Sequence, residues 1–299
     1  MATNAVWTAS FQGFEMYAIT GITGQVGGVV AQTLLARGDT VRAVVRSAAK
    51  GAAWQARGCD IALADMADAD ALTHAFTGVQ GVFVLLPPNF DPSADFAESR
   101  AIIAALVKAL QAARPARVVC LSTVGAHATQ PSLLTQLSLL EQHLGALPLP
   151  VTFLRAAWFM ENVAWDVAYA RTHGILESYL SPLGRAIPMV ATADVGTTAA
   201  ELLREPWEGK RVVELCGPEP VSPQMLADAL SHALGRSVAP QVVAREEWET
   251  RFRAQGMRHP TPRMQMLDGF NDGWMTFEGA PRRGTTTLAE VVRTLAGCH

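Results

Sequence analysis

The sequence predicts an α/β fold, with a doubly wound parallel sheet and a smaller, mainly helical C-terminal lobe. Strand-like and helix-like segments alternate from Met16 to about Arg155, the strand-like segments are continuous apolar runs, and a glycine-rich turn follows the first of them. Continuous apolar runs are typical of strands buried on both faces, as in a parallel sheet. Alternation with short connections predicts right-handed strand–helix–strand units.

The elements follow one another in a regular order. Strands are expected at residues 16–20, 40–46, 59–64, 81–86, 117–122 and 151–155. Helices are expected between them at 28–38, from about Asp68, at about 94–113 and at about 132–146. After Arg155 aromatic residues cluster, a short strand is expected at 211–217, and helices are expected at 222–235, 245–255, 260–272 and 286–296. This change of pattern predicts a second lobe that closes a cleft at the sheet's carboxyl edge.

Composition excludes several classes of protein. The chain has 299 residues, of which 49% are hydrophobic, so it can bury a large core. Its net charge of −3 argues against a nucleic-acid surface. No apolar run reaches the roughly 18 residues of a membrane span. The four cysteines are scattered, without metal-ligand spacing, which is typical of reduced thiols in a cytoplasmic protein.

Residues 1–15 lack the basic start and the long apolar stretch of a signal peptide. Because Met16 stands directly before the first strand, we expect this segment to be a disordered extension, a misassigned start or a remnant of cloning. It is excluded from the predicted fold.

The turn after the first strand has the spacing of a dinucleotide-binding loop. Gly21 permits a tight turn, Gly24 lets the backbone approach a diphosphate, and Gly27 lets the following helix pack close to the strand. The N-terminus of that helix offers unpaired N–H groups and a positive dipole end to the phosphates. The alternative is chance, in a chain with 24 glycines. The sequence thus predicts a Rossmann-type domain at 16–155 and a substrate-side lobe at 156–299, from which some strands return to the main sheet.

The end of the second strand favours NADP(H) over NAD(H). An NAD site usually has an acidic residue there to bind the ribose hydroxyls. This chain has Arg46, with Ser47 and Lys50 nearby, and a guanidinium can bind a 2′-phosphate in a bidentate way. The alternative is a solvated arginine at a strand end.

Later strand ends would line the same crevice, since ligands bind beyond the carboxyl ends of the strands. Asp65, with the adjacent Met66, would contact the adenine side, and Leu86, Pro87 and Pro88 would wall the nicotinamide ribose. Ser122 and Thr123 follow the fifth strand.

The segments GITGQVG, VRAVVRS, ALADMAD, LLPP, LSTVGAH and LRAAWFMEN occur in this order. Together they resemble the NmrA-like family of atypical short-chain dehydrogenases/reductases, over the whole chain from Met16. This family includes reductases of quinones, azo compounds and other small electrophiles, as well as nucleotide-sensing regulators. The resemblance implies a phosphate loop made of Gly21, Thr23, Gly24, Gln25, Val26 and Gly27, a 2′-phosphate contact at Arg46, and adenine- and ribose-side contacts at Asp65 and Leu86. It also implies that Asn162, Trp158 and Phe159 flank the nicotinamide and the substrate.

The proton relay of typical short-chain dehydrogenases is absent. That relay needs Tyr-x-x-x-Lys, in which the lysine lowers the pKa of the tyrosine. The residues four positions after Tyr17, Tyr169 and Tyr179 are Gly21, His173 and Leu183. The lysines are Lys50, Lys108 and Lys210, so none lies in the helix after the fifth strand.

Hydride transfer itself does not require that relay, because the cofactor supplies the hydride and the protein supplies orientation. His127 is the candidate proton donor, since the ordinary pKa of histidine is near neutrality, although a loop histidine without a role is the alternative. Phe90, Trp158, Phe159 and Trp274 are candidates for an apolar wall around a flat substrate, or for packing between the lobes. Glu141 and Glu161 are given no acid–base role.

Three hypotheses about function follow. The first is an NADPH-dependent reductase of a small conjugated electrophile such as a quinone or azo compound. The alternative is a non-catalytic NADP(H) sensor that acts through a protein partner, and an isomerase or epimerase reaction with bound nucleotide is a third. A small-molecule substrate is expected as the main partner, without nucleic acid, membrane or metal.

Overall fold

A computed structural model describes residues 15–297, so Cys298 and nearly all of the predicted extension lie outside the described residues. In the described chain one eight-stranded sheet has the order β12-β10-β6-β5-β4-β1-β2-β3, and all its neighbouring strands are parallel. Its strands are β1 (Met16–Ile19), β2 (Thr40–Val45), β3 (Asp60–Leu63), β4 (Gly81–Val84), β5 (Arg117–Thr123), β6 (Val151–Ala156), β10 (Lys210–Cys216) and β12 (Arg282–Arg283). The chain order reverses between β1 and β4, which makes a crevice at their carboxyl ends.

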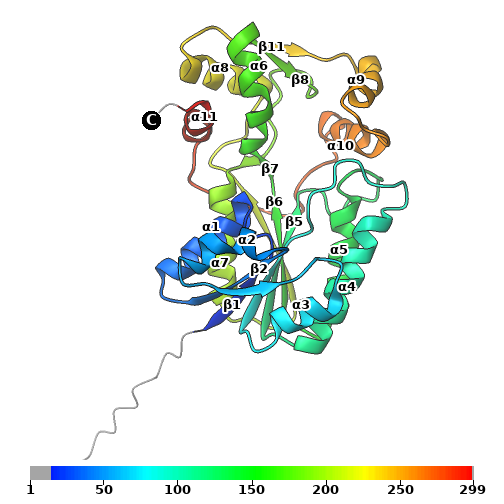
Figure 1. The fold of residues 1–299 in the computed structure, drawn as a ribbon. Helices are drawn as coiled ribbons and strands as arrows, with labels where there is room; N and C mark the ends of the chain where they lie inside the picture. Colours follow the sequence, from blue (N-terminus) through cyan, green and yellow to red (C-terminus); the bar gives the residue numbers. More distant parts are fainter. Residues whose placement is uncertain (1–14, 298–299) are drawn as a thin grey trace, which may run out of the picture.

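Helices cover both faces of the sheet (Figure 1). One face carries α1 (Gln25–Ala36), α2 (Ala48–Gln55) and α7 (Thr192–Arg204), and the other carries α3 (Ala69–Phe76), α4 (Ala97–Ala113) and α5 (Thr135–Gly145). The prediction of a doubly wound parallel sheet is confirmed. Glu15, which the sequence analysis placed in the extension, accepts a backbone hydrogen bond from Thr40 at the start of β2.

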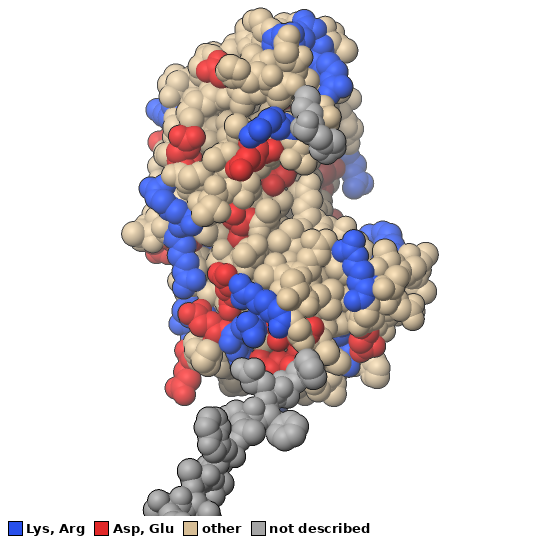
Figure 2. All heavy atoms as spheres, turned by 90° about the vertical axis from the view of Figure 1, so that its left-hand side faces the viewer, with Lys and Arg blue, Asp and Glu red and all other residues tan. Residues whose placement is uncertain are grey.

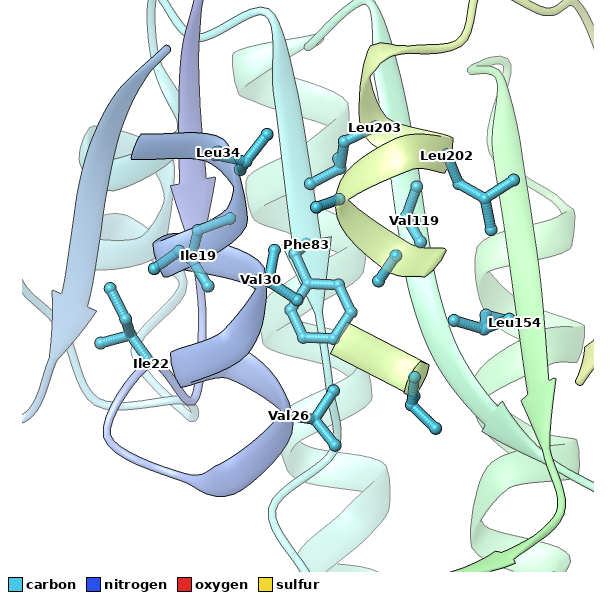
Figure 3. Close-up of a cluster of buried hydrophobic side chains, with 14 of the residues drawn as sticks. Ile19, Ile22, Val26, Val30, Leu34, Phe83, Val119, Leu154, Leu202 and Leu203 are labelled. Atoms are coloured by element: carbon cyan, nitrogen blue, oxygen red, sulfur yellow. The ribbon is translucent and has the colours of Figure 1, made fainter. Parts of the chain in front are cut away.

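An apolar core fills the space between the sheet and helices α1 and α7. Phe83 of β4 lies between these two helices, close to Val26 and Val30 of α1 (Figure 3). The helices approach closely because Gly196 of α7 has no side chain: a Cβ there would lie 2.5 Å from the Cβ of Val29. Close packing of this kind leaves little room for change.

The C-terminal lobe lies above the carboxyl ends of the strands (Figure 1). It consists of η1 (Met160–Val163), α6 (Ala164–His173), α8 (Pro223–Leu234), η2 (Arg245–Glu247), α9 (Trp248–Ala254), α10 (Thr261–Asp272) and α11 (Leu288–Ala296). Two small parallel ladders join β7 (Trp158–Phe159) to β9 (Met189–Val190) and β8 (Ile175–Ser178) to β11 (Ala239–Val242). A separate apolar cluster, with Phe252 and Val292 fully buried, forms its core.

Helix α7 is the main element of the sheet domain that the sequence analysis does not expect. Its segment contains Gly196 and several threonines, which have low helix propensity. Tertiary contacts compensate, because its apolar face packs on α1 and its N-terminus is held by the carboxylate of Glu161. The strand β10, like β12, returns from the second half of the chain to the main sheet, while the domain boundary near Arg155 stays a prediction.

Acidic and basic side chains are interspersed on the face that carries α1 and α7 (Figure 2). Within residues 15–297, each helix is too short or too polar to cross a bilayer.

Candidate functional site

The residues predicted to bind the cofactor follow five strands that are adjacent in the sheet. The phosphate loop follows β1, Arg46 follows β2, Asp65 follows β3, Leu86 follows β4, and Ser122 and Thr123 end β5. Because the strands are parallel, these positions lie along one edge of the sheet, on both sides of the point where the strand order reverses.

The phosphate loop has the geometry of an anion cradle. Gly21 has a φ of +60°, and its carbonyl accepts a hydrogen bond from the N–H of Gly24 at 2.9 Å. A Cβ on Gly27 would lie 2.4 Å from that same carbonyl oxygen, so only glycine fits there. Helix α1 has no side-chain cap and no acidic residue in its first turn. Its free N–H groups therefore fit a diphosphate.

Within that loop the side chains divide by exposure. Thr23 and Gln25 are exposed, whereas Ile22 and Val26 are buried against the sheet. The exposed residues can approach a ligand, and the buried ones fix the loop.

The end of β2 carries a second positive site. The side chains of Arg46, Ser47 and Lys50 are exposed, and none of them has an ion pair or side-chain hydrogen bond within residues 15–297. Helix α2 begins directly after Ser47, again without a side-chain cap or an acidic residue in its first turn. Two cations beside a helix N-terminus fit one further phosphate.

Other predicted cofactor contacts are partly used by the protein itself. The carboxylate of Asp65 accepts the N–H of Ala67 in its own turn at 2.9 Å. Met66 packs on the core beneath α3 and α4. The Ser122 hydroxyl donates to Glu141 at 2.5 Å, and the Thr123 hydroxyl donates to a neighbouring carbonyl.

Glu141 belongs to a buried ionic network around Arg155 of β6. The guanidinium donates to both Glu141 oxygens, at 2.9 and 2.7 Å, and also to Glu278. Glu214 of β10 lies 4.0 Å away and accepts the N–H groups of Glu278 and Gly279. The network joins the ends of β5, β6 and β10, and its bonds to Arg155 hold the pKa of Glu278 below the usual range. We assign it a structural role.

A cavity of about 360 Å³ lies where the ends of β4, β5 and β6 meet the C-terminal lobe. Its sheet-side end is mostly apolar and includes Leu85, Leu86, Leu121, Ala156 and Ala157. Of the residues predicted for the substrate wall, Phe90, Trp158, Phe159 and Asn162 line it, and Leu86, Pro88, Ser122 and Thr123 line it as well. Phe90 and Trp165, both exposed, make an edge-to-face contact beside it.

Three residues predicted to lie near the nicotinamide or the substrate do not line this cavity. His127 is exposed and lies 3.8 Å from the Glu278 carboxylate, so the structure does not bring it to the cavity wall. Trp274 packs instead on α10, where a Cβ on Gly269 would lie 2.6 Å from its ring. Pro87 also lies outside the lining. The proton-donor role of His127 therefore stays a prediction without geometric support.

The far end of the cavity is polar, and the sequence analysis does not find it. Asp166 of α6, Glu177 of β8 and Arg263 of α10 line it together with Tyr179. Burial raises the pKa of Asp166 to about 6, and burial also raises that of Tyr179. These side chains come from segments with no recognisable spacing, so only the fold brings them together.

The loop between β4 and α4 is fastened over the cavity. The carboxylate of Asp91 accepts the backbone N–H groups of Arg258 and His259, just before α10. The side-chain amide of Gln136 donates to the carbonyl of Asn89 at 3.1 Å. The first of these contacts hold the loop that carries Phe90 against the C-terminal lobe, and the bond from Gln136 holds it against α5.

The profile of the NmrA-like family matches residues 15–262. The chain belongs to the NmrA-like family. This confirms the resemblance found in the sequence.

Two curated relatives are named as reductases. Quinone oxidoreductase 2 of Escherichia coli (strain K12) is 27% identical over 289 residues, which cover 93% of this chain and 97% of the relative. The NAD(P)H azoreductase of Xenophilus azovorans is 28% identical over 244 residues, 81% of this chain and 82% of the relative. The crystal structure of the E. coli NADPH-dependent quinone oxidoreductase complexed with NADPH superposes with a TM-score of 0.78 at 26% identity, covering 94% of this chain and 99% of that chain.

Proposed function

We propose that this protein is an NADPH-dependent reductase of a small conjugated electrophile, such as a quinone or an azo compound. The observation that carries the proposal is the continuity between the phosphate loop and the cavity. A Cβ on Gly21 would lie 2.6 Å from the side chain of Leu85, and Leu85 lines the cavity. A dinucleotide held at the loop therefore has its other end directed to a space large enough for a flat ring.

The chain's own residues bind and orient the reactants. The amides at the start of α1 hold the diphosphate, and Arg46 with Lys50 holds the 2′-phosphate. The nicotinamide, when bound, supplies the hydride. Trp158 and Phe159 flank the cavity and confine a planar acceptor, and its apolar sheet-side end excludes water from the hydride path.

The relatives support the same proposal. The two curated relatives are named as a quinone oxidoreductase and an NAD(P)H azoreductase, and the structural neighbour contains NADPH. The cavity favours a reductase over a nucleotide sensor, because a sensor requires no space for a second small molecule beside the nucleotide.

The test is NADPH oxidation by the purified protein with a panel of benzoquinones, naphthoquinones and azo dyes, followed by the loss of NADPH absorbance. We expect turnover with at least one acceptor class and a lower KM for NADPH than for NADH. Trp158→Ala should raise the KM for the acceptor, and Trp207→Ala, at another half-buried tryptophan that does not line the cavity, is the matched control. Rates equal to those without protein, for every acceptor, would refute the proposed function.

A further inference from the structure

The polar end of the cavity holds an acidic and a cationic side chain that are not paired with each other. Asp166 and Arg263 line the same cavity, and the charge of each shifts the pKa of the other, yet the two side chains form no ion pair. Within the described chain the Asp166 carboxylate has no hydrogen bond from any donor. A largely buried carboxyl without a partner is costly, so such a group is more often found protonated or facing a ligand.

The neighbouring acid behaves differently. Glu177 receives a hydrogen bond from Arg251 at 2.8 Å, and Arg251 also bonds Glu247. Glu177 therefore has its own counter-charge on the outer side of the lobe. Asp166 is the unpaired acid among those that line the cavity within residues 15–297.

Arg263 is held in place without an acidic partner. Its guanidinium carbon lies 4.6 Å from the ring centre of Phe252, and its polar contact within the described chain is a weak hydrogen bond of 3.9 Å to the sulfur of Met257. Stacking on an aromatic ring fixes the plane of a guanidinium and leaves its N–H donors free. Those donors are available to an oxygen atom in the cavity.

We propose that Asp166 and Arg263 bind an oxygen atom of a quinone-type substrate, with Asp166 as the acid that protonates it and Arg263 as the hydrogen-bond donor that stabilises its negative charge. This inference rests on the proposed function. It requires the acceptor to carry a carbonyl oxygen that lies at the polar end of the cavity, in the C-terminal lobe. This end is remote from the apolar sheet-side end of the cavity.

The proton and electron balance of the reaction is simple. Hydride brings two electrons and one hydrogen to the quinone, which leaves one quinone oxygen as a phenolate. The protonated carboxyl of Asp166 gives its proton to that oxygen, so its O–H bond breaks as the phenol O–H bond forms. Water returns a proton to Asp166. The sum is quinone, NADPH and one proton giving hydroquinone and NADP⁺.

The charged groups around Asp166 suit this role. Burial first, and then the negative charge of Glu177 on β8, raise the pKa of Asp166 to about 6, while Arg263 on α10 opposes them. Helices α8 and α11 also pack on α6 but, among the described residues, add no charge that acts on this carboxyl. A donor with a pKa close to the working pH is suited to proton transfer.

The decisive experiment measures the pH dependence of kcat/KM for 1,4-naphthoquinone at saturating NADPH. For the unmodified protein we expect kcat/KM to fall above the pKa of Asp166, near pH 6. Asp166→Asn should lose this inflection and about 100-fold of the rate below it, within the usual range for general acid catalysis. Asp166→Glu should restore the inflection, and Asp272→Asn, the same change at an exposed position on α10, should behave as the unmodified protein.

A binding measurement separates the Arg263 part of the proposal from turnover. Calorimetric titration of the nucleotide-free protein with 1,4-naphthoquinone should give a Kd about tenfold higher for Arg263→Met, as expected for a lost charge-assisted hydrogen bond. An unchanged Kd would overturn the role of Arg263.

The failures of the two proposals are distinguishable. No turnover of any acceptor by the unmodified protein would refute the reductase function. Normal turnover with a flat pH profile between about pH 5 and 8, or an inflection that persists in Asp166→Asn, would overturn the role of Asp166 and leave the reductase function standing. The profile of the unmodified protein decides this even if the variant does not fold.

Discussion

The replacement of Gly27 by alanine tests the phosphate loop directly. The added Cβ would lie 2.4 Å from the carbonyl oxygen of Gly21 and 2.7 Å from its carbonyl carbon, whereas ordinary contacts begin at 3.4 Å. Because both atoms belong to the backbone, the loop must move by about 1 Å rather than a side chain rotating away. Overpacking of this size costs about 1–3 kcal/mol.

We expect that cost to fall on nucleotide binding, because the loop amides no longer converge on the diphosphate. The Kd for NADPH should rise by about 10- to 100-fold, since each 1.4 kcal/mol is a factor of ten. Calorimetric titration measures the Kd, and urea unfolding measures how much of the cost falls on stability instead. Gly184→Ala is the control, because a Cβ at Gly184 meets nothing within 4 Å. If Gly27→Ala left both the Kd and the unfolding free energy unchanged, the close approach would be wrong.

Three further predictions concern charge and packing. Arg46→Ala should raise the Kd for NADPH by about 10- to 100-fold, because a charge-assisted hydrogen bond to phosphate contributes about 1.5–3 kcal/mol. The Kd for NADH, measured in the same calorimetric titrations, should stay within about twofold. Equal effects on both nucleotides would contradict this role of Arg46. Gly196→Ala should lower the unfolding free energy by about 1–3 kcal/mol, measured in urea, since its Cβ would lie 2.5 Å from Val29, and a neutral result would show that α1 and α7 can separate freely. The pKa of Asp166 in the folded state is raised from 3.8 to about 6, so the folded state binds more protons than the unfolded state between these values. The unfolding free energy should therefore fall by about 1–3 kcal/mol as the pH rises from about 4 to 6. This fall should be smaller in Asp166→Asn, and an identical pH profile of the two proteins would contradict the raised pKa.

The nucleotide half of the site could be predicted from the sequence because its signals are local. Gly21 and Gly27 stand at fixed offsets after a strand, and Arg46 stands at the end of the next one. Once the strands are parallel and adjacent, the carboxyl edge follows from topology alone. The fold class could be predicted for the same reason, since buried parallel strands are legible as apolar runs.

The substrate half could not be predicted in the same way. Asp166, Glu177 and Arg263 lie on three elements whose order and spacing give no signal, and they meet only through the packing of α6, β8 and α10. His127 illustrates the converse. It was chosen for the chemistry of its side chain, but that side chain is exposed beside Glu278 and does not line the cavity. Helix α7 was missed because tertiary contacts, and not propensity, stabilise it.

The central claim is that the loop after β1 binds a nicotinamide dinucleotide and that the end of β2 selects its phosphorylated form. Equilibrium titration of the purified protein with NADPH and with NADH, in parallel, tests both parts at once. We predict saturable binding of one NADPH per chain, with a Kd at least about tenfold below that for NADH, the effect of one charge-assisted phosphate contact. The absence of saturable binding of either nucleotide would contradict the claim.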